Sequence, residues 1–276
     1  MKSNTALTIA LAVAFGVALP NAAQAITISD EIGYIDSNSY QLTEDNKRLV
    51  NTYLRMFRYY TKRNFSATRT VRVLLSNYPE HVEPILHAAF ERYPKSYEQI
   101  IKAAIDAEPG FTKDIMAVAM HTQVAKPAEL VRIAVEAEPA YADEIVVEAS
   151  RVDPANVEEL VRVAVKVEPE MADSIMQSAS ASQPEKVEGI VHATLSVLPA
   201  IGDYLASSLS DLIDLIASDD AEPSANEVTS RKEALSVLKG AYRAGMSYQE
   251  IETIANAHGI GEEEIATVIE SKDSGS

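Results

Sequence analysis

The sequence predicts an all-α protein: a right-handed-type α-solenoid of helical hairpins about 30 residues long, with a helical N-terminal cap and a small C-terminal helical unit. Two observations predict this fold. Eight of the 12 prolines lie on one 15-residue register, and the blocks between them carry aliphatic and small residues at helical spacing. A content of 47% hydrophobic and 24% charged residues, with no Trp and only 10 glycines, is typical of a globular, helix-rich chain.

The first 25 residues have the three parts of a secretory signal peptide. Lys2 gives the positive start, residues 5–19 form an uncharged apolar run, and residues 23–25 (Ala-Gln-Ala) are a small-x-small cleavage site. A retained anchor helix is the alternative, but the run is shorter than a typical membrane span. We therefore expect cleavage after Ala25, no transmembrane segment in the mature chain, and a location in the periplasm or outside the cell.

The proline register divides the middle of the chain into blocks of one helix and one turn. Proline is favoured at the first helical position, and the acidic residue that often precedes it suits the positive end of the helix dipole. Val124 holds the one register position without a proline, and Pro127 follows it. The prolines on the register are Pro79, Pro94, Pro109, Pro139, Pro154, Pro169, Pro184 and Pro199.

Within each block, two positions four residues apart predict the buried face of the helix. The first is always aliphatic and the second is alanine in most blocks, a pair that allows close packing. The aliphatic residues are Ile85, Ile100, Ile115, Leu130, Ile145, Leu160, Ile175, Ile190 and Leu205. The alanines are Ala89, Ala104, Ala119, Ala134, Ala149, Ala164 and Ala179.

Successive blocks alternate in character, so the structural unit is two helices. The third residue of one type is apolar (Phe111, Tyr141, Met171, Ile201), whereas the other type has Lys126, Asn156 or Lys186 there. Short turns make neighbouring helices antiparallel, and a hairpin of about 30 residues must stack on the next to bury its apolar face.

The array, about residues 78–217, resembles the α-solenoid class and is similar in architecture to tetratricopeptide and HEAT arrays. Its period is shorter than in either family, and the Trp-Leu-Gly-Tyr pattern of tetratricopeptide repeats is missing. The resemblance therefore implies an architecture, and no function or binding residue is carried over.

The flanking segments complete the expected organisation. Residues 26–77 form an arm, in which residues 26–28 are a candidate strand, and two capping helices at about 43–62 and 67–77. Residues 218–230 are an acidic linker, and residues 272–276 a tail. Residues 231–271 form three short helices, at about 231–243, 247–258 and 262–271. Capping boxes at Ser230 with Glu233 and at Ser247 with Glu250 are expected to start the first two.

Charge is distributed unevenly along the chain. The net charge is −17, yet residues 46–75 contain eight basic residues and no acidic one. Residues 218–276 contain 5 basic and 12 acidic residues, which excludes nucleic-acid binding by the helices there.

The basic segment predicts a contact site at Arg55, Arg58, Tyr59, Lys62 and Arg63. In a cell envelope its anionic partner would be an acidic protein, a polysaccharide or a lipid headgroup. Two alternatives remain open. The arginines lie against the chain's own acidic helices while the aromatics fill the cap, or the basic end of one copy meets the acidic end of another.

A second basic pattern recurs every 30 residues at Lys102, Arg132, Arg162 and His192. Stacking would align these residues in a ladder along one face of the array. The alternative is a solvated face of ion pairs, because Glu98, Glu158 and Glu188 precede three of them by four residues.

No pattern in the sequence predicts catalysis, a metal site or a cofactor. The chain has no cysteine, its five histidines lack metal-ligand spacing, and no phosphate loop or nucleophile elbow is present. The leading hypothesis is an exported, non-catalytic scaffold or adaptor that binds an envelope protein. The competing hypothesis is a secreted surface-matrix component that self-associates or binds anionic polysaccharide.

Overall fold

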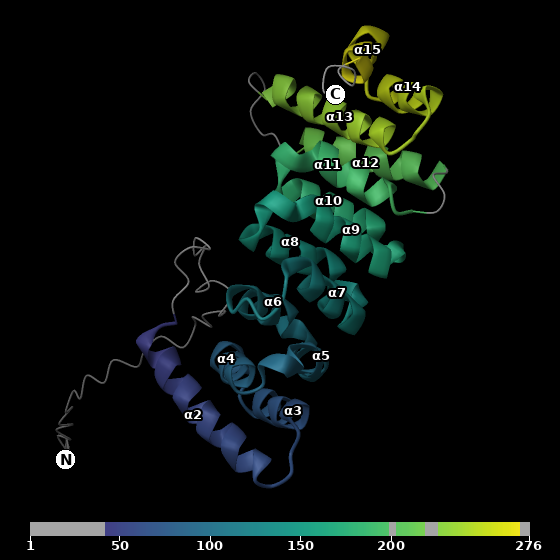
Figure 1. The fold of residues 1–276 in the computed structure, drawn as a ribbon. Coiled ribbons are helices and arrows are strands. Elements are labelled where there is room, and N and C mark those ends of the chain that lie inside the picture. The colour runs from purple at the N-terminus through teal and green to yellow at the C-terminus, as the bar shows by residue number, and fades with distance from the viewer. Residues whose placement is uncertain (1–41, 199–202, 219–225, 271–276) are drawn as a thin grey trace, which may run out of the picture. The chain divides into compact units, whose positions relative to one another are not determined.

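The computed structural model describes residues 42–198, 203–218 and 226–270 (Figure 1). Throughout these ranges the regular elements are α-helices and short 3₁₀ helices, without a strand. Successive helices pack against their neighbours, so the predicted all-α solenoid is confirmed. The predicted signal peptide, the candidate strand at 26–28, residues 219–225 of the expected linker and the tail fall outside the described residues.

The α-helices are α2 (Glu44–Thr61), α3 (Ala67–Asn77), α4 (Val82–Arg92), α5 (Tyr97–Ala107), α6 (Thr112–His121), α7 (Pro127–Ala137), α8 (Ala142–Val152), α9 (Val157–Val167), α10 (Ala172–Ser182), α11 (Val187–Leu195), α12 (Asp203–Ser218), α13 (Asn226–Arg243), α14 (Tyr248–Ala257) and α15 (Glu262–Glu270). From α3 to α12 the α-helices start 15 or 16 residues apart. The 3₁₀ helices are η1 (Pro79–His81), η2 (Pro94–Ser96), η3 (Pro109–Phe111), η4 (Pro139–Tyr141), η5 (Pro154–Asn156), η6 (Pro169–Met171) and η7 (Pro184–Lys186).

The seven register prolines within the described residues start 3₁₀ helices, and the α-helices begin three residues later, so the prediction that these prolines open the α-helices is wrong. Proline disfavours the α conformation in the residue before it, as at Glu138, where φ is −146° and ψ is 86°. The N–H of Glu138 still donates to the Ala134 carbonyl at 2.9 Å. The acidic residue therefore closes the preceding helix and lies near its negative end, rather than only starting the next one.

The one block without a register proline keeps the period by another route. Pro127 is the first residue of α7, and it lies 15 residues after Thr112, the first residue of α6. The connection from α6 has no 3₁₀ helix, and Gln123 in it adopts a left-handed conformation with φ 51°. The chain thus changes the shape of one connection without losing the register of the helices.

The predicted buried face is confirmed. Every described residue at the aliphatic position, from Ile85 to Ile190, is at most 1% exposed. All seven alanines four residues later are fully buried. Because alanine projects only a methyl group, the backbones of neighbouring helices approach closely along this face.

The helices form two layers in which even- and odd-numbered members alternate (Figure 1). The first layer consists of α2, α4, α6, α8, α10 and α12, and the second of α3, α5, α7, α9, α11 and α13. The alternation of the blocks maps onto these layers, since Phe111, Tyr141 and Met171 all precede helices of the first layer. The capping helices α2 and α3 extend the same two layers as the array.

The C-terminal helices also continue the array. Helix α13 packs against α11 and α12, while α14 and α15 pack against α13. Helix α13 begins at Asn226, earlier than the expected residue 231, so Ser230 lies inside it and is not its cap; that prediction is wrong. The capping box of Ser247 and Glu250 at α14 is confirmed. The ion pairs of Glu188 with Lys239 at 3.1 Å and Arg243 at 2.6 Å join α11 to α13.

Candidate functional site

Helix α2 is built as predicted, with one face buried against the array. Thr43 caps it, accepting a hydrogen bond from the Asn46 N–H at 3.2 Å. Its buried residues are Val50, Tyr53, Leu54 and Phe57, at helical spacing. This face packs mainly on α4, so α2 is the terminal helix of the first layer.

Aromatic side chains fix α2 to its neighbours. Phe57 is fully buried and meets Tyr93 edge to face, with 5.9 Å between ring centroids. A hydrogen bond of 2.5 Å joins the Tyr53 hydroxyl to His81 Nδ1. Burial, followed by the nearby charge of Glu80, raises the pKa of Tyr53 to about 12. These aromatics fill the cap, as one of the two alternatives expected.

The predicted contact residues lie together on the opposite, exposed side of α2. Arg55 and Tyr59 are four residues apart on α2, Arg58 precedes Tyr59, Lys62 is the C-cap of the helix, and Arg63 follows it. The Tyr59 side chain is 51% exposed, with the Arg63 guanidinium 4.3 Å from its ring centroid in a cation–π contact. We call Arg55, Arg58, Tyr59, Lys62 and Arg63 the basic face.

No acid among the described residues neutralises the cations of the basic face. Arg55, Arg58, Lys62 and Arg63 have no carboxylate of the described residues within 4.0 Å. By contrast, Lys47, Arg48 and Arg72 pair with Glu44, Asp45 and Asp106 at 2.8, 3.3 and 2.7 Å. The alternative in which the arginines lie against acidic helices therefore applies to Arg72 and not to the basic face.

Sequence reasoning missed one member of this surface. The Arg69 guanidinium on α3 lies 4.0 Å from the ring centroid of Phe65, a residue just beyond the C-terminal end of α2. In the sequence, Phe65 and Arg69 are a second pair of an aromatic and a basic residue. Only the bend between α2 and α3 brings this pair near Tyr59 and Arg63. Tyr60 bridges the two pairs, with ring centroids 5.5 Å from Tyr59 and 5.2 Å from Phe65.

The predicted ladder lies along the second layer, and its first two members form ion pairs. Lys102 Nζ lies 3.2 Å from Glu98 and 2.9 Å from Glu136 on α7. Arg132 pairs with Glu129 at 2.7 Å and with Glu136 at 2.5 Å. Hydrogen bonds from Lys102 and then Arg132 hold the pKa of Glu136 below its usual range. This geometry favours the ion-pair alternative for Lys102 and Arg132.

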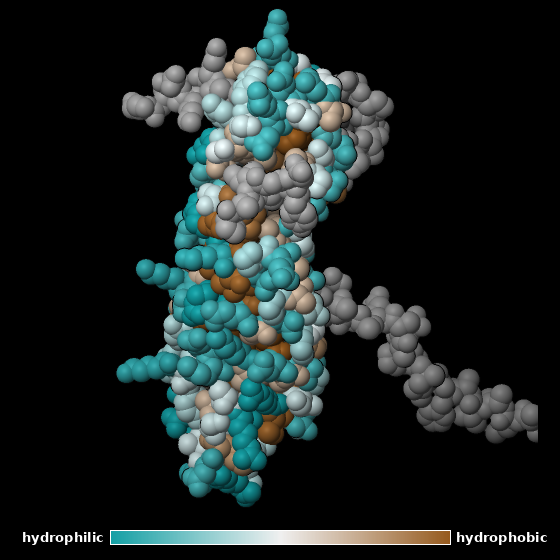
Figure 2. All heavy atoms as spheres, turned by 90° about the vertical axis from the view of Figure 1, so that its right-hand side faces the viewer, coloured by the Kyte–Doolittle hydropathy of each residue, from teal (hydrophilic) through white to brown (hydrophobic). Residues whose placement is uncertain are grey.

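The other ladder positions differ in their partners. Arg162 pairs with Glu159 at 2.8 Å, while partial burial, and then the charges of Arg243 and Arg162, lower the pKa of His192. Pairs 34 residues apart, Arg72 with Asp106 and Lys102 with Glu136, join adjacent helices of the layer. This spacing is a sequence signal that was overlooked. Hydrophilic side chains cover much of this side of the molecule, with hydrophobic residues showing between them (Figure 2).

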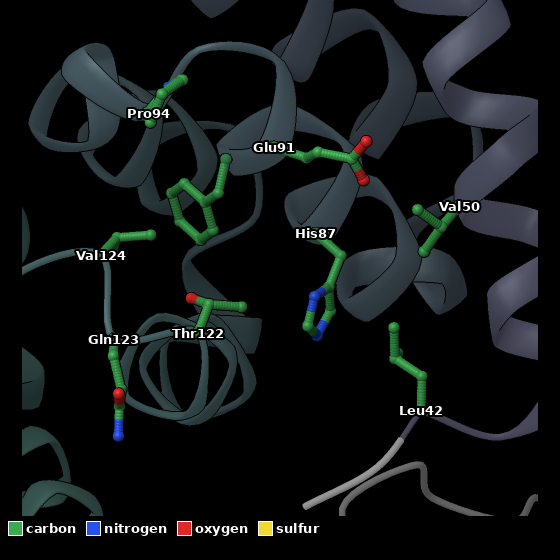
Figure 3. Close-up of a pocket in the computed structure, with 9 residues that line it drawn as sticks. Leu42, Val50, His87, Glu91, Pro94, Thr122, Gln123 and Val124 are labelled. Carbon is green, nitrogen blue, oxygen red and sulfur yellow. The ribbon is translucent and has the colours of Figure 1, made fainter.

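A hollow of ≈ 570 Å³ lies between α2, α4 and the connection from α6 to α7 (Figure 3). Its lining is mainly apolar, and His87 projects into it. Burial, and then the neighbouring His121, lower the pKa of His87 to about 4. The lining residues are Leu42, Val50, His87, Phe90, Glu91, Pro94, Thr122, Gln123 and Val124.

The lowered pKa of His87 predicts a loss of stability in acid. Its folded-state pKa of about 4 lies below the ordinary histidine value of 6.5, so the unfolded chain binds the proton more tightly. Above pH 6.5 the His87 ring is neutral in both states and does not lower the free energy of unfolding. Below pH 6.5 the unfolded chain takes up the proton first, so the free energy of unfolding falls as the pH drops towards 4. Because the ring is only partly buried, we expect the loss to be about 2 kcal/mol.

Urea unfolding of wild type and His87→Gln at several pH values measures this effect. The carboxylates titrate in both proteins, so the difference between the two pH profiles isolates His87. We expect the variant to lose less stability between pH 6.5 and 4, and identical profiles would contradict the assignment.

In the described ranges, His, Asp and Glu side chains form no cluster of three that could hold a metal ion. None of the helices at 42–198, 203–218 and 226–270 has the length and apolarity needed to cross a bilayer. No family model, curated protein or solved structure matches this chain. Among the exposed surfaces of the described residues, the basic face combines an exposed tyrosine with four cations.

Proposed function

We propose that the chain is an exported, non-catalytic helical-repeat scaffold that binds an acidic protein in the cell envelope through the basic face of α2. One observation carries this proposal: four exposed cations surround Tyr59 without an acidic partner in the described residues, in a chain of net charge −17. Export is supported by the signal-peptide pattern of residues 1–25.

The position of the basic face suits a binding surface. The buried residues of α2 hold the helix on the array, so the exposed side chains project from a fixed backbone. Like charges on adjacent helical turns repel one another, and an acidic partner relieves that repulsion. Tyr and Arg are also the residue types most enriched at the energetic centres of protein interfaces.

The aromatic component favours a protein over a simple polyanion. Tyr59 offers apolar area as well as a hydroxyl, and the Arg63 guanidinium stacked on it keeps its charge exposed. A protein surface can bury this pair and also supply carboxylates for the flanking arginines, whose planar forks bind carboxylates in a bidentate manner. Anionic polysaccharide is the competing ligand class.

Charge reversal of the basic face tests the proposal. Arg55, Arg58, Lys62 and Arg63 are changed together to Glu, and the protein is used to capture partners from an envelope extract. We expect the recovery of specific protein partners to fall at least about tenfold, because contact charges become repulsive.

A matched variant controls for net charge. Changing Lys95, Lys126, Lys166 and Lys232 to Glu alters the net charge by the same amount at exposed positions elsewhere. This variant is expected to capture partners as wild type does. Equal capture by the basic-face variant would overturn the proposal, and so would capture of polysaccharide alone.

A further inference from the structure

The two ends of the helical array carry opposite charge. Residues 46–75, which contain most of α2 and α3, have eight basic residues and no acidic one. Residues 248–270, which contain α14 and α15, have six acidic residues and no Lys or Arg. By packing order α2 is the first helix of its layer, while α14 and α15 lie beyond the last members of the two layers.

The acidic end has an exposed surface that is similar in kind to the basic face. Tyr248, the first residue of α14, is 38% exposed. Partial desolvation, and then the nearby charges of Glu262 and Glu252, raise the pKa of its hydroxyl. Each end therefore presents an exposed tyrosine among charges of a single sign. We call Tyr248, Glu252 and Glu262 the acidic face.

Some acidic side chains at this end form hydrogen bonds or ion pairs with other described residues, and others do not. Glu250 closes the capping box of α14, and Glu264 pairs with Arg231 at 2.5 Å. Glu252 and Glu262 have no Lys, Arg or His of the described residues within 4.0 Å. Two carboxylates are thus free to meet an incoming basic surface.

We propose that the acidic protein bound by the basic face is a second copy of this chain, which docks through its acidic face. The proposal rests on the proposed function and names the partner of the same surface. Because the two faces are different and lie at different ends, the contact is heterologous and adds copies head to tail. Exposed ion pairs are weak and are screened by salt, so the association should be concentration-dependent and salt-sensitive.

Sedimentation velocity of the exported chain, residues 26–276, tests this association. At about 0.02 M salt we expect species larger than a monomer that grow with protein concentration, and at about 0.5 M salt a monomer. A monomer at all protein concentrations in low salt would overturn the proposal.

Two charge-reversed variants locate the contact. One carries Arg55→Glu, Arg58→Glu, Lys62→Glu and Arg63→Glu, and the other carries Glu252→Lys and Glu262→Lys. Each variant alone presents like charges at both faces and is expected to stay monomeric. An equimolar mixture restores opposite charges at every junction and is expected to associate again. Association of either variant alone, or none in the mixture, would contradict the assigned faces.

The absence of cysteine from the chain allows a direct test of orientation. Thr52→Cys lies on the exposed side of α2, and Gln249→Cys is exposed on α14. We expect disulfide-linked dimers when the two variants are mixed under oxidation and few from either alone. If one variant alone formed as much dimer as the mixture, the contact would be symmetric. That result would overturn the head-to-tail arrangement.

The results separate this inference from the proposed function. If the wild-type chain is monomeric at low salt but the basic face still captures another envelope protein, only the inference about a second copy fails. If the basic-face variant captures the same proteins as wild type, the proposed function fails as well.

Discussion

Replacing Ile145 by alanine is expected to lower the free energy of unfolding by about 2–5 kcal/mol. Ile145 is fully buried in α8, which contacts α6 and α10 in its own layer and α7 and α9 in the other. The substitution removes aliphatic volume from the face shared by these helices and leaves a cavity where the alanines already bring backbones close. Urea unfolding followed by circular dichroism measures the change.

The neighbouring residue in the same helix provides the control. Glu144 is exposed, and Glu144→Ala is expected to change stability by less than about 0.5 kcal/mol. If the Ile145 and Glu144 variants were equally stable, the face defined by the 15-residue register would not be the core of the array.

Replacing Gly240 by alanine is expected to destabilise the docking of α13, by about 1–3 kcal/mol. A Cβ at this position would lie 2.5 Å from the Glu188 carbonyl oxygen and 2.9 Å from Val191 Cβ, both on α11. The carbonyl belongs to the helix backbone and cannot move aside as a side chain would. Alanine's better helix propensity, worth about 1 kcal/mol, offsets only part of this cost.

Thermal unfolding and hydrogen exchange of α13 check the effect of Gly240→Ala. We expect a lower melting temperature and faster amide exchange in α13. Gly110→Ala is the matched control, because no heavy atom lies within 4 Å of a Cβ built there. Equal behaviour of the two variants would show that α13 does not pack on α11 as described.

The repetitive part of the fold was predictable because its signals are local. The spacing of Ile145 and Ala149 within one block defines the buried face of one helix, and the alternation of Tyr141 with Asn156 distinguishes the two layers. The expected bounds of the two capping helices, 43–62 and 67–77, lie within one residue of those of α2 and α3.

Features that depend on contacts between distant residues were not predictable. Ser230 and Glu233 have capping-box spacing, yet they lie inside α13, which begins at Asn226 and packs on α11 and α12. In the seven connections with a described register proline, a 3₁₀ helix precedes the α-helix and shifts its start by three residues, which residue preference alone does not reveal.

The residues of the candidate site were predictable from the sequence, but the presence or absence of acidic partners was not. The spacing of Arg55, Arg58 and Lys62 placed them on one face of a helix, but spacing cannot say whether acidic side chains from other helices reach them. Among the described residues these three side chains have no carboxylate partner, whereas Lys102 has two. Only the three-dimensional positions of Glu98 and Glu136 separate the two basic patterns.

Site-specific photo-crosslinking at Tyr59 in the living cell is the most direct test of the claim that the exposed side of α2 is a contact surface. A photoreactive amino acid is placed at Tyr59 and, in a parallel strain, at the exposed Glu144 on α8. The account predicts a discrete crosslinked protein at position 59 that is missing at position 144. The absence of an adduct at position 59, or the same adduct at both positions, would contradict it.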